Sequence, residues 1–525
     1  MLDLLIINGM IIDGTGSPGY YAAVGVEGDT VRIIRGNVSS LDAARTIDAT
    51  DHVVCPGFID MHAHSALMIL AEPRHEPKIR QGVTTELIGI DGNSYAPFRS
   101  NDDLLAFIKL NAGLEGTPPL PGTWSTVKQY LAMFDGNVPV NIAYILGNSP
   151  VRIDAIGWNN VPATGVDLEN MKAVIREAME EGAFGMSTGL DYPPGNYADT
   201  DELVELSRQV AELGGIYHTH LRYKLGDRFL DPIREAIEIG RRSGVPIHIT
   251  HVSQRNNYPG GSREMLQPIE DAHESGQDVT FDSVPLYPGS TRLIIMFPDW
   301  AHEGGPENLI EVLRSDEHRE RLRQEVGPAG VPWQDMWLTY FKRPENQKYE
   351  GVSISELAIM RGKHPVDAMC DLLLEEDLQT SYNSMMANLK SLPSLIAHPL
   401  SMVGSDALLL GDNPPPRTYG AFPSILGEYV REEKHMDLPT GVRKMTSFPA
   451  QRLGIPDRGI LRDGMKADIT IFHPREVKAM ATRTNSRQFP VGIPYVIVNG
   501  TVVIDDGDHT GATPGRALKH GRPSS

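Results

Sequence analysis

The sequence predicts a (β/α)8 barrel that carries a small β-sandwich domain built from both ends of the chain. Eight short apolar and β-branched segments alternate with longer helical patterns, which is typical of a parallel sheet. Histidines gather near the ends of several of these segments, as expected where barrel strands open onto a common mouth. A doubly wound open sheet is the alternative for the same alternation.

The middle of the chain supplies the barrel. The candidate strands are Phe58–His64, Thr84–Asp91, Asn141–Gly147, Gly182–Thr188, Ile216–Arg222, Pro246–Val252, Asp278–Pro285 and Ser401–Ala407. Helical patterns between them begin near an acid and end at a glycine, which are ordinary start and stop signals. They cover Asp167–Gly182, Thr200–Gly214 and Asp231–Gly244.

The two ends of the chain resemble each other. Leu4–Gly14 and Tyr495–Gly507 each contain a β-rich run, an Asn-Gly pair and a second β-rich run, which is the pattern of a hairpin. We therefore expect a small β domain from residues 1–57 plus 458–525, with residues 58–457 as the barrel. Two unrelated hairpins are the alternative.

The gap between the seventh and eighth strands is too long for one helix. Loops of that length are usually functional lids or inserted subdomains. We expect an inserted, lid-like region at about residues 290–360, before the last barrel strand.

Composition narrows the class of protein. The 525 residues are 40% hydrophobic and 22% charged, with a net charge of −20, so a nucleic-acid partner is not expected. Two cysteines, Cys55 and Cys370, are too few for a disulfide framework or a thiolate zinc site. The first residues lack a basic leader and no apolar run could span a bilayer, so we expect a cytoplasmic protein without a membrane partner. Whether the protein forms a homo-oligomer stays open.

The strongest chemical signal is the segment FIDMHAH. His62 and His64 lie two apart on a strand, so their imidazoles project from one face. A lone histidine is usually structural, but such a pair at the end of a barrel strand predicts a divalent metal ion.

Other strand ends add candidate ligands. His220 and His251 lie near the ends of the fifth and sixth strands, and Asp406 ends the eighth. His218 and His248 lie deeper and are better interpreted as supporting or core histidines. Asp406 beside these imidazoles is a metal ligand, a general base, or both.

These segments together resemble the amidohydrolase superfamily, and within it the D-aminoacylase (N-acyl-D-amino-acid deacylase) family. The resemblance is carried by PGFIDMHAH, GVTTELIG, STGLDYPPGNYADTDEL, THLR, GVPIHITH, VGSDA, PRTYGAFPSILGEYVRE and several segments near the C-terminus. It implies His62 and His64 on one metal ion and His220 and His251 on a more tightly held one. It also implies that Asp406 binds metal and shuttles the proton, and that Arg417 grips the substrate carboxylate.

The sequence departs from this family at three positions. Asp91, which alone would be a turn residue in GIDGNS, stands where the family has a metal-contacting cysteine. Carboxylate oxygen also binds zinc and can bridge two ions, so we expect Asp91 to be a ligand. Val284 stands where a substrate-facing tyrosine is common, and Ser253 replaces a lysine. Both put the usual substrate in question.

The resemblance implies hydrolysis of a small N-acylated amino acid by a metal-bound water, with Asp406 as general base and acid. Zn2+, one ion or two, is the expected cofactor, and Mn2+ or Co2+ become competitive with a harder ligand such as Asp91. Hydrolysis of another amide, a cyclic amide, a lactone or a carbamate is the first alternative. No lysine ends a candidate strand, which argues against the lysine-bridged relatives. A barrel without activity, acting as a scaffold, is the second alternative.

Overall fold

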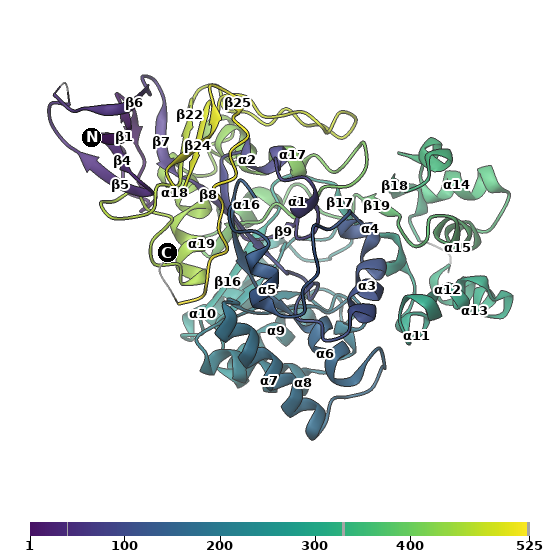
Figure 1. Cartoon of the computed structure of the whole chain (residues 1–525). Helices are drawn as coiled ribbons and strands as arrows, with labels where there is room; N and C mark the ends of the chain where they lie inside the picture. Colours follow the sequence, from purple (N-terminus) through teal and green to yellow (C-terminus); the bar gives the residue numbers. More distant parts are fainter. Residues whose placement is uncertain (39, 328–330, 522–525) are drawn as a thin grey trace.

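A computed structural model describes residues 1–38, 40–327 and 331–521. Its centre is a barrel of parallel strands (Figure 1). They are β8 (Phe58–Asp60), β10 (Val83–Ile88), β11 (Asn141–Tyr144) with β12 (Leu146–Gly147), β13 (Gly185–Gly189), β14 (Ile216–His220), β15 (Ile247–Ile249), β16 (Val279–Ser283) and β20 (Ser401–Val403). The ring closes where β9 (Ala63–His64) pairs with β21 (Ala407–Leu408). The barrel prediction is confirmed, and the open-sheet alternative is wrong.

Helices cover the outside of the barrel, and the predicted ones are present. The predicted ones are α7 (Val166–Glu181), α8 (Thr200–Glu212) and α9 (Asp231–Ser243), and α10 (Ser262–Glu274) is a further one. In α7 the buried residues Met171, Val174, Ile175 and Ala178 recur at intervals of three and four, so one apolar face packs on the strands. Asp199 caps α8 by accepting a hydrogen bond from the backbone N–H of Glu202.

Two sheets lie beside the barrel, at the left of Figure 1. One has the order β5-β4-β1-β6 and the other β25-β24-β23-β22-β7-β2-β3. The first sheet comprises β1 (Leu2–Ile7), β4 (Ala23–Glu27), β5 (Thr30–Ile34) and β6 (Ala43–Asp48). The second comprises β2 (Met10–Ile11), β3 (Tyr20–Tyr21), β7 (Val53–Pro56), β22 (Ile469–Phe472), β23 (Tyr495–Val498), β24 (Thr501–Asp505) and β25 (Asp508–His509). Apolar residues of both sheets, such as Ile6, Val24, Ile471 and Ile497, share one core.

The two predicted terminal hairpins have different outcomes. At the C-terminal end, β23 and β24 pair in antiparallel fashion across Asn499-Gly500, as predicted. At the N-terminal end the hairpin prediction is wrong, because β1 and β2 belong to different sheets. Asn8, with a φ of 64°, turns the chain from one sheet to the other instead.

The segment between β16 and β20 forms its own layer over one side of the barrel. Three antiparallel strands, β17 (Gly289–Arg292), β18 (Met336–Tyr340) and β19 (Ser381–Ser384), pack with α12 (Pro306–Arg314), α13 (Asp316–Val326), α14 (Ile354–Arg361) and α15 (Pro365–Glu375). The helices lie on the side of the barrel opposite the two terminal sheets (Figure 1). Leu293, Leu313, Leu338 and Leu372 belong to a core that is built mostly from this layer and also includes Leu110 of α3 (Asn101–Leu110).

Within the described residues, the helices are all too short or too polar to cross a membrane.

Candidate metal centre

Strand pairing sets the positions of His62, His64 and Asp406. The backbone N–H of Asp406 donates to the carbonyl of His62 at 2.9 Å, and the neighbouring β9 and β21 pair in parallel. The buried Asp60 carboxylate strengthens this link, because it accepts from the backbone N–H of His62 at 3.0 Å and from that of Ser405 at 2.9 Å. Residues far apart in sequence are therefore held at a fixed separation.

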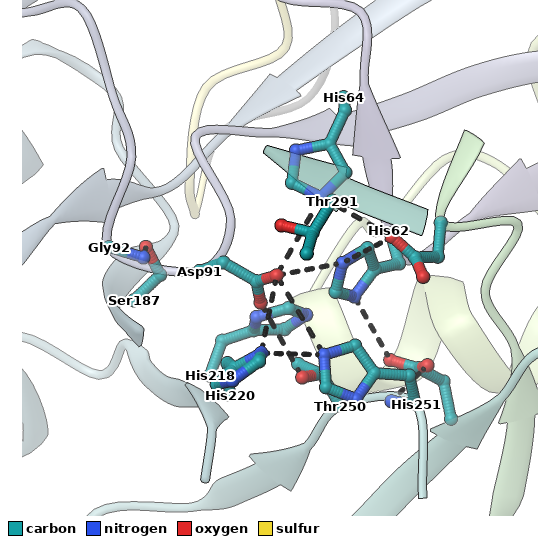
Figure 2. A network of polar contacts seen from close by, with 12 residues as sticks. His62, His64, Asp91, Gly92, Ser187, His218, His220, Thr250, His251 and Thr291 are labelled. Carbon is teal, nitrogen blue, oxygen red and sulfur yellow. Dashed lines mark hydrogen bonds and ion pairs between the residues drawn. The ribbon is translucent and has the colours of Figure 1, made fainter. Parts of the chain in front are cut away.

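Asp91 lies at the centre of four imidazoles (Figure 2). Its Oδ2 atom is 3.3 Å from His62 Nε2, 3.6 Å from His64 Nε2, 3.7 Å from His220 Nδ1 and 3.8 Å from His251 Nε2. The other carboxylate oxygen accepts a hydrogen bond from Thr250 at 3.5 Å. One oxygen of Asp91 thus faces both histidine pairs.

Asp406 also approaches this cluster. Its Oδ1 atom is 3.4 Å from His64 Nε2 and 3.7 Å from His62 Nε2. The structure therefore brings together all six residues for which the sequence suggested metal binding: His62, His64, Asp91, His220, His251 and Asp406.

The donor set fits a divalent ion. Neither ring nitrogen of the fully buried His62 forms a well-aligned hydrogen bond among the described residues; the nearest carboxylate oxygens lie 3.3 Å from Nε2 (Asp91) and 3.9 Å from Nδ1 (Asp282). A tetrahedral ion with bonds of about 2.1 Å holds its ligand atoms roughly 3.4 Å apart. The shorter separations between carboxylate oxygens and imidazole nitrogens here, 3.3 and 3.4 Å, match that spacing.

The electrostatics of the cluster also favour a cation. Burial alone would lower the pKa of His64, but Asp406, Asp91 and Glu115 raise it to about 10. Burial would raise the pKa of Asp91, yet the imidazoles of His62, His220 and His251 hold it well below its usual range. Excess negative charge is thus balanced by protons on imidazole nitrogens, which a divalent ion would displace on binding.

His218 and His248 lie one layer deeper, where both are fully buried. His248 contacts Thr280 through Nδ1 at 2.8 Å and Asp282 through Nε2 at 3.0 Å. Burial lowers the pKa of both histidines, that of His218 to about 3, so they are neutral. Asp282 also accepts from the backbone N–H of His251 at 2.7 Å. These buried residues support the cluster of candidate ligands from the interior of the barrel.

Two buried carboxylates that the sequence did not single out hold the outer faces of the imidazoles. Glu115 Oε1 lies 3.3 Å from His64 Nδ1, and Asp191 Oδ2 lies 3.4 Å from His220 Nε2. Such contacts fix the ring orientation and leave the opposite nitrogen for metal. Asp191 follows the fourth barrel strand in the segment STGLD, and this position just after a strand end could have marked it as a candidate site residue. Glu115 ends α4 (Ala112–Glu115), between strands, and nothing in its sequence context marks it.

Arg417 lies against Asp406 at the start of α17 (Arg417–Ser424). Its Nη2 donates to Asp406 Oδ2 at 3.0 Å and its Nε donates to the Asp406 carbonyl at 2.6 Å, while Nη1 donates to the carbonyl of Pro288. Burial would raise the pKa of Asp406, but this guanidinium and the nearby imidazoles lower it to about 2.

A cavity of about 210 Å³ opens above the cluster. Asp91, His251 and Asp406 lie at its base, and Ser253 and Val284, the two departures from the family pattern, also line it. The layer between β16 and β20 contributes one wall through β17 and β19, including Ser290, Thr291 and Tyr382.

Three of the residues at the cavity base have an unusual backbone. Asp91, His251 and Asp406 have φ values of 55°, 35° and 48°, in the left-handed region. Each follows the end of a barrel strand, so this conformation turns the side chain into the mouth.

Comparison with known proteins agrees with this geometry. A family model described as "Amidohydrolase family" matches residues 45–504. The chain is 33% identical over 521 residues to the D-aminoacylase of Alcaligenes xylosoxydans xylosoxydans, covering 98% of this chain and 97% of the relative.

Solved structures show the same similarity. A D-aminoacylase studied for its binuclear metal centre has a TM-score of 0.83 at 31% identity, covering 99% of this chain and 100% of the other. N-acyl-D-glutamate deacylase from Bordetella bronchiseptica, with zinc and a phosphonate mimic of the tetrahedral intermediate, has a TM-score of 0.83 at 30% identity, covering 99% of both chains. The chain belongs to the amidohydrolase family, in the branch that contains the D-aminoacylases.

Proposed function

We propose that this protein is a metal-dependent deacylase that hydrolyses the amide bond of N-acylated D-amino acids. The observation that carries the proposal is the position of Asp91 Oδ2 within 3.8 Å of one nitrogen on each of four imidazoles, with Asp406 Oδ1 3.4 Å from His64 Nε2. The substrate class follows the relatives, which are a D-aminoacylase and an N-acyl-D-glutamate deacylase.

In this proposal His62, His64, Asp91, His220 and His251 would hold one or two divalent ions, with His62 and His64 on one side of Asp91 Oδ2 and His220 and His251 on the other. Zn2+ is the proposed ion, as in the Bordetella bronchiseptica relative, with Mn2+ and Co2+ as competitors because Asp91 is a hard ligand. A bound ion would polarise the scissile carbonyl and lower the pKa of water at the site.

Asp406 is the proposed proton carrier. Its carboxylate stays ionised, because the Arg417 guanidinium and the imidazoles outweigh burial. It takes a proton from the attacking water and delivers it to the leaving nitrogen, which departs as an amine. The Arg417 contacts keep the carboxylate pointed at the cavity during both transfers.

A substrate screen tests the proposal. N-acetyl-D- and N-acetyl-L-amino acids are incubated with the protein loaded with zinc, manganese or cobalt, and amine release is measured. Cleavage of the D series, absent in Asp406→Asn, is the expected result. If neither series is cleaved, the substrate is instead another amide or a cyclic compound.

A further inference from the structure

Lys78 is a fully buried lysine in α2 (Glu76–Ile79), and it links three strands of the barrel. Its Nζ atom donates to the carboxylate of Asp60, which ends β8, and to Ser405 Oγ at 2.7 Å, just after β20. Glu86 Oε1, in β10, lies 3.5 Å from the same nitrogen. One ammonium group therefore connects the first, second and eighth barrel strands.

Each of these strands leads into a residue proposed to bind the metal ion. Asp60 accepts from the backbone N–H of His62 at 3.0 Å, and Ser405 directly precedes Asp406. Asp91 follows the end of β10. Lys78 therefore contacts the strands that carry these ligands.

The Glu86 carboxylate extends the network to the residue that follows His64. The hydroxyl of Ser65 donates to Glu86 Oε2, and His75 Nε2 lies 3.0 Å from Glu86 Oε1. Burial would raise the pKa of Glu86, but His75 and Lys78 lower it to about 2, so this carboxylate is ionised. The strand end that carries His64 is thus tied to the same network.

The carboxylates of this network need the Lys78 ammonium beside them. Asp60 and Glu86 are paired across β8 and β10, and both side chains are 0% exposed. Two carboxylates held together in the interior repel each other strongly unless a cation lies between them. The ammonium turns this repulsion into attraction of both strands toward one shared group.

His220 and His251 are held by other contacts. Asp191 Oδ2 lies 3.4 Å from His220 Nε2, and Asp282 accepts from the backbone N–H of His251 at 2.7 Å. Loss of Lys78 would therefore disturb the ligands of the first, second and eighth strands before those of the fifth and sixth.

We propose that Lys78 is a positioning residue of the metal centre, whose ammonium sets the spacing between the strand ends that carry His62, His64, Asp91 and Asp406. This role rests on the proposed metal-dependent function, but ion binding can be measured without a substrate. Because the ligand atoms of an ion must lie within about 0.2 Å of their required distances, small shifts of these strand ends lower the affinity.

Chelator competition with Zn2+ tests this role on Lys78→Met and on a matched control, Lys444→Met. Lys444, in α18 (Leu438–Met445), is 2% exposed and donates to the Ser401 carbonyl at 3.0 Å, at the start of β20. Both substitutions thus remove a buried ammonium that contacts the eighth strand, at its two ends. Lys78→Met should weaken zinc affinity roughly 10- to 100-fold, as losses of supporting contacts around metal ligands usually do. Lys444→Met should keep the affinity near that of wild type even where its melting temperature falls.

Cobalt substitution provides a readout that a loss of stability alone does not move. The visible absorption band of bound Co2+ depends on the geometry of its ligands, so Lys78→Met should shift the band and Lys444→Met should not. Ser405→Ala is a milder variant, because it removes the hydroxyl that joins Lys78 to the eighth strand and keeps every charge. It should weaken zinc binding in the same direction, by a smaller factor.

Three results would overturn the positioning role. They are wild-type zinc affinity in folded Lys78→Met, equal losses in Lys78→Met and Lys444→Met, and, if Lys78→Met does not fold, unchanged affinity in Ser405→Ala. Turnover of N-acetyl-D-amino acids by wild type separates the two proposals, since cleavage combined with unchanged zinc affinity in Lys78→Met refutes only the positioning role. A selective loss of affinity in Lys78→Met, without any cleavage by wild type, refutes only the deacylase function.

Discussion

The Arg417 guanidinium binds Asp406 twice, through the carboxylate at 3.0 Å and through the backbone carbonyl of the same residue at 2.6 Å. The side chain proposed to carry the proton is thus held by one guanidinium at both its carboxylate and its backbone. Its pKa is low for the same reason, since the nearby positive charge outweighs the effect of burial.

Removal of this guanidinium should change the pH dependence of the reaction. Asp406 works as a base only when ionised, and loss of the positive charge raises its pKa. In Arg417→Met the acidic limb of the kcat profile should therefore move to higher pH, with a kcat about 10- to 100-fold lower at neutral pH because the carboxylate is less well oriented. Kinetics from the lowest pH at which the protein stays folded up to pH 9 measure both effects. A profile that overlays that of wild type would show that Arg417 does not act through Asp406.

Asp406 itself should separate catalysis from metal binding. Asp406→Asn keeps the size and one carbonyl oxygen but cannot accept the proton, so turnover should fall by at least roughly 100-fold. The metal content should stay near that of wild type, because the imidazoles and Asp91 remain. Metal analysis by mass spectrometry and an activity assay on the same sample test this, and substantial activity in the variant would remove Asp406 from the mechanism.

Asp91 offers a metal-selectivity experiment. Asp91→Ala should lose at least one ion, since its Oδ2 faces both histidine pairs. Asp91→Cys should retain metal and favour zinc over manganese more strongly than wild type, because a thiolate is the softer ligand. Dialysis against an equimolar mixture of the two ions followed by metal analysis gives the ratio. Full metal occupancy in Asp91→Ala would show that Asp91 is a turn residue and not a metal ligand.

Glu115 should tune the metal affinity without touching the metal. Its contact with His64 Nδ1 orients the ring, and loss of such a contact usually costs about 10- to 100-fold in affinity. Glu115→Gln, which preserves size, should show this loss in a chelator competition assay while its circular dichroism is unchanged. Asp102→Asn, at an exposed position of α3 (Asn101–Leu110), is the matched control. Equal affinities in both variants would contradict the role.

The sequence predicted the barrel and the convergence of the candidate ligand side chains, because strand alternation and strand ends are local patterns. His220 and Asp406 could be placed together from their positions at strand ends alone. The supporting contacts could not be predicted in this way, because Glu115 reaches His64 from a short helix whose course depends on the whole fold. The Asn8-Gly9 signal predicted a hairpin, yet a turn of that kind fixes only the direction of the chain and not which sheet receives the next strand.

The left-handed backbone at Asp91, His251 and Asp406 links activity to stability. Each such residue raises the energy of the folded state by about 1 kcal/mol or more relative to an ordinary conformation. Glycine adopts the same backbone without that cost, but Asp91→Gly would also remove the buried carboxylate that pairs with the four imidazoles. Selection on backbone conformation alone would favour glycine over the side chains present at these three positions. Their presence marks a stability–activity trade-off, in which ion binding restores what the strained strand ends cost.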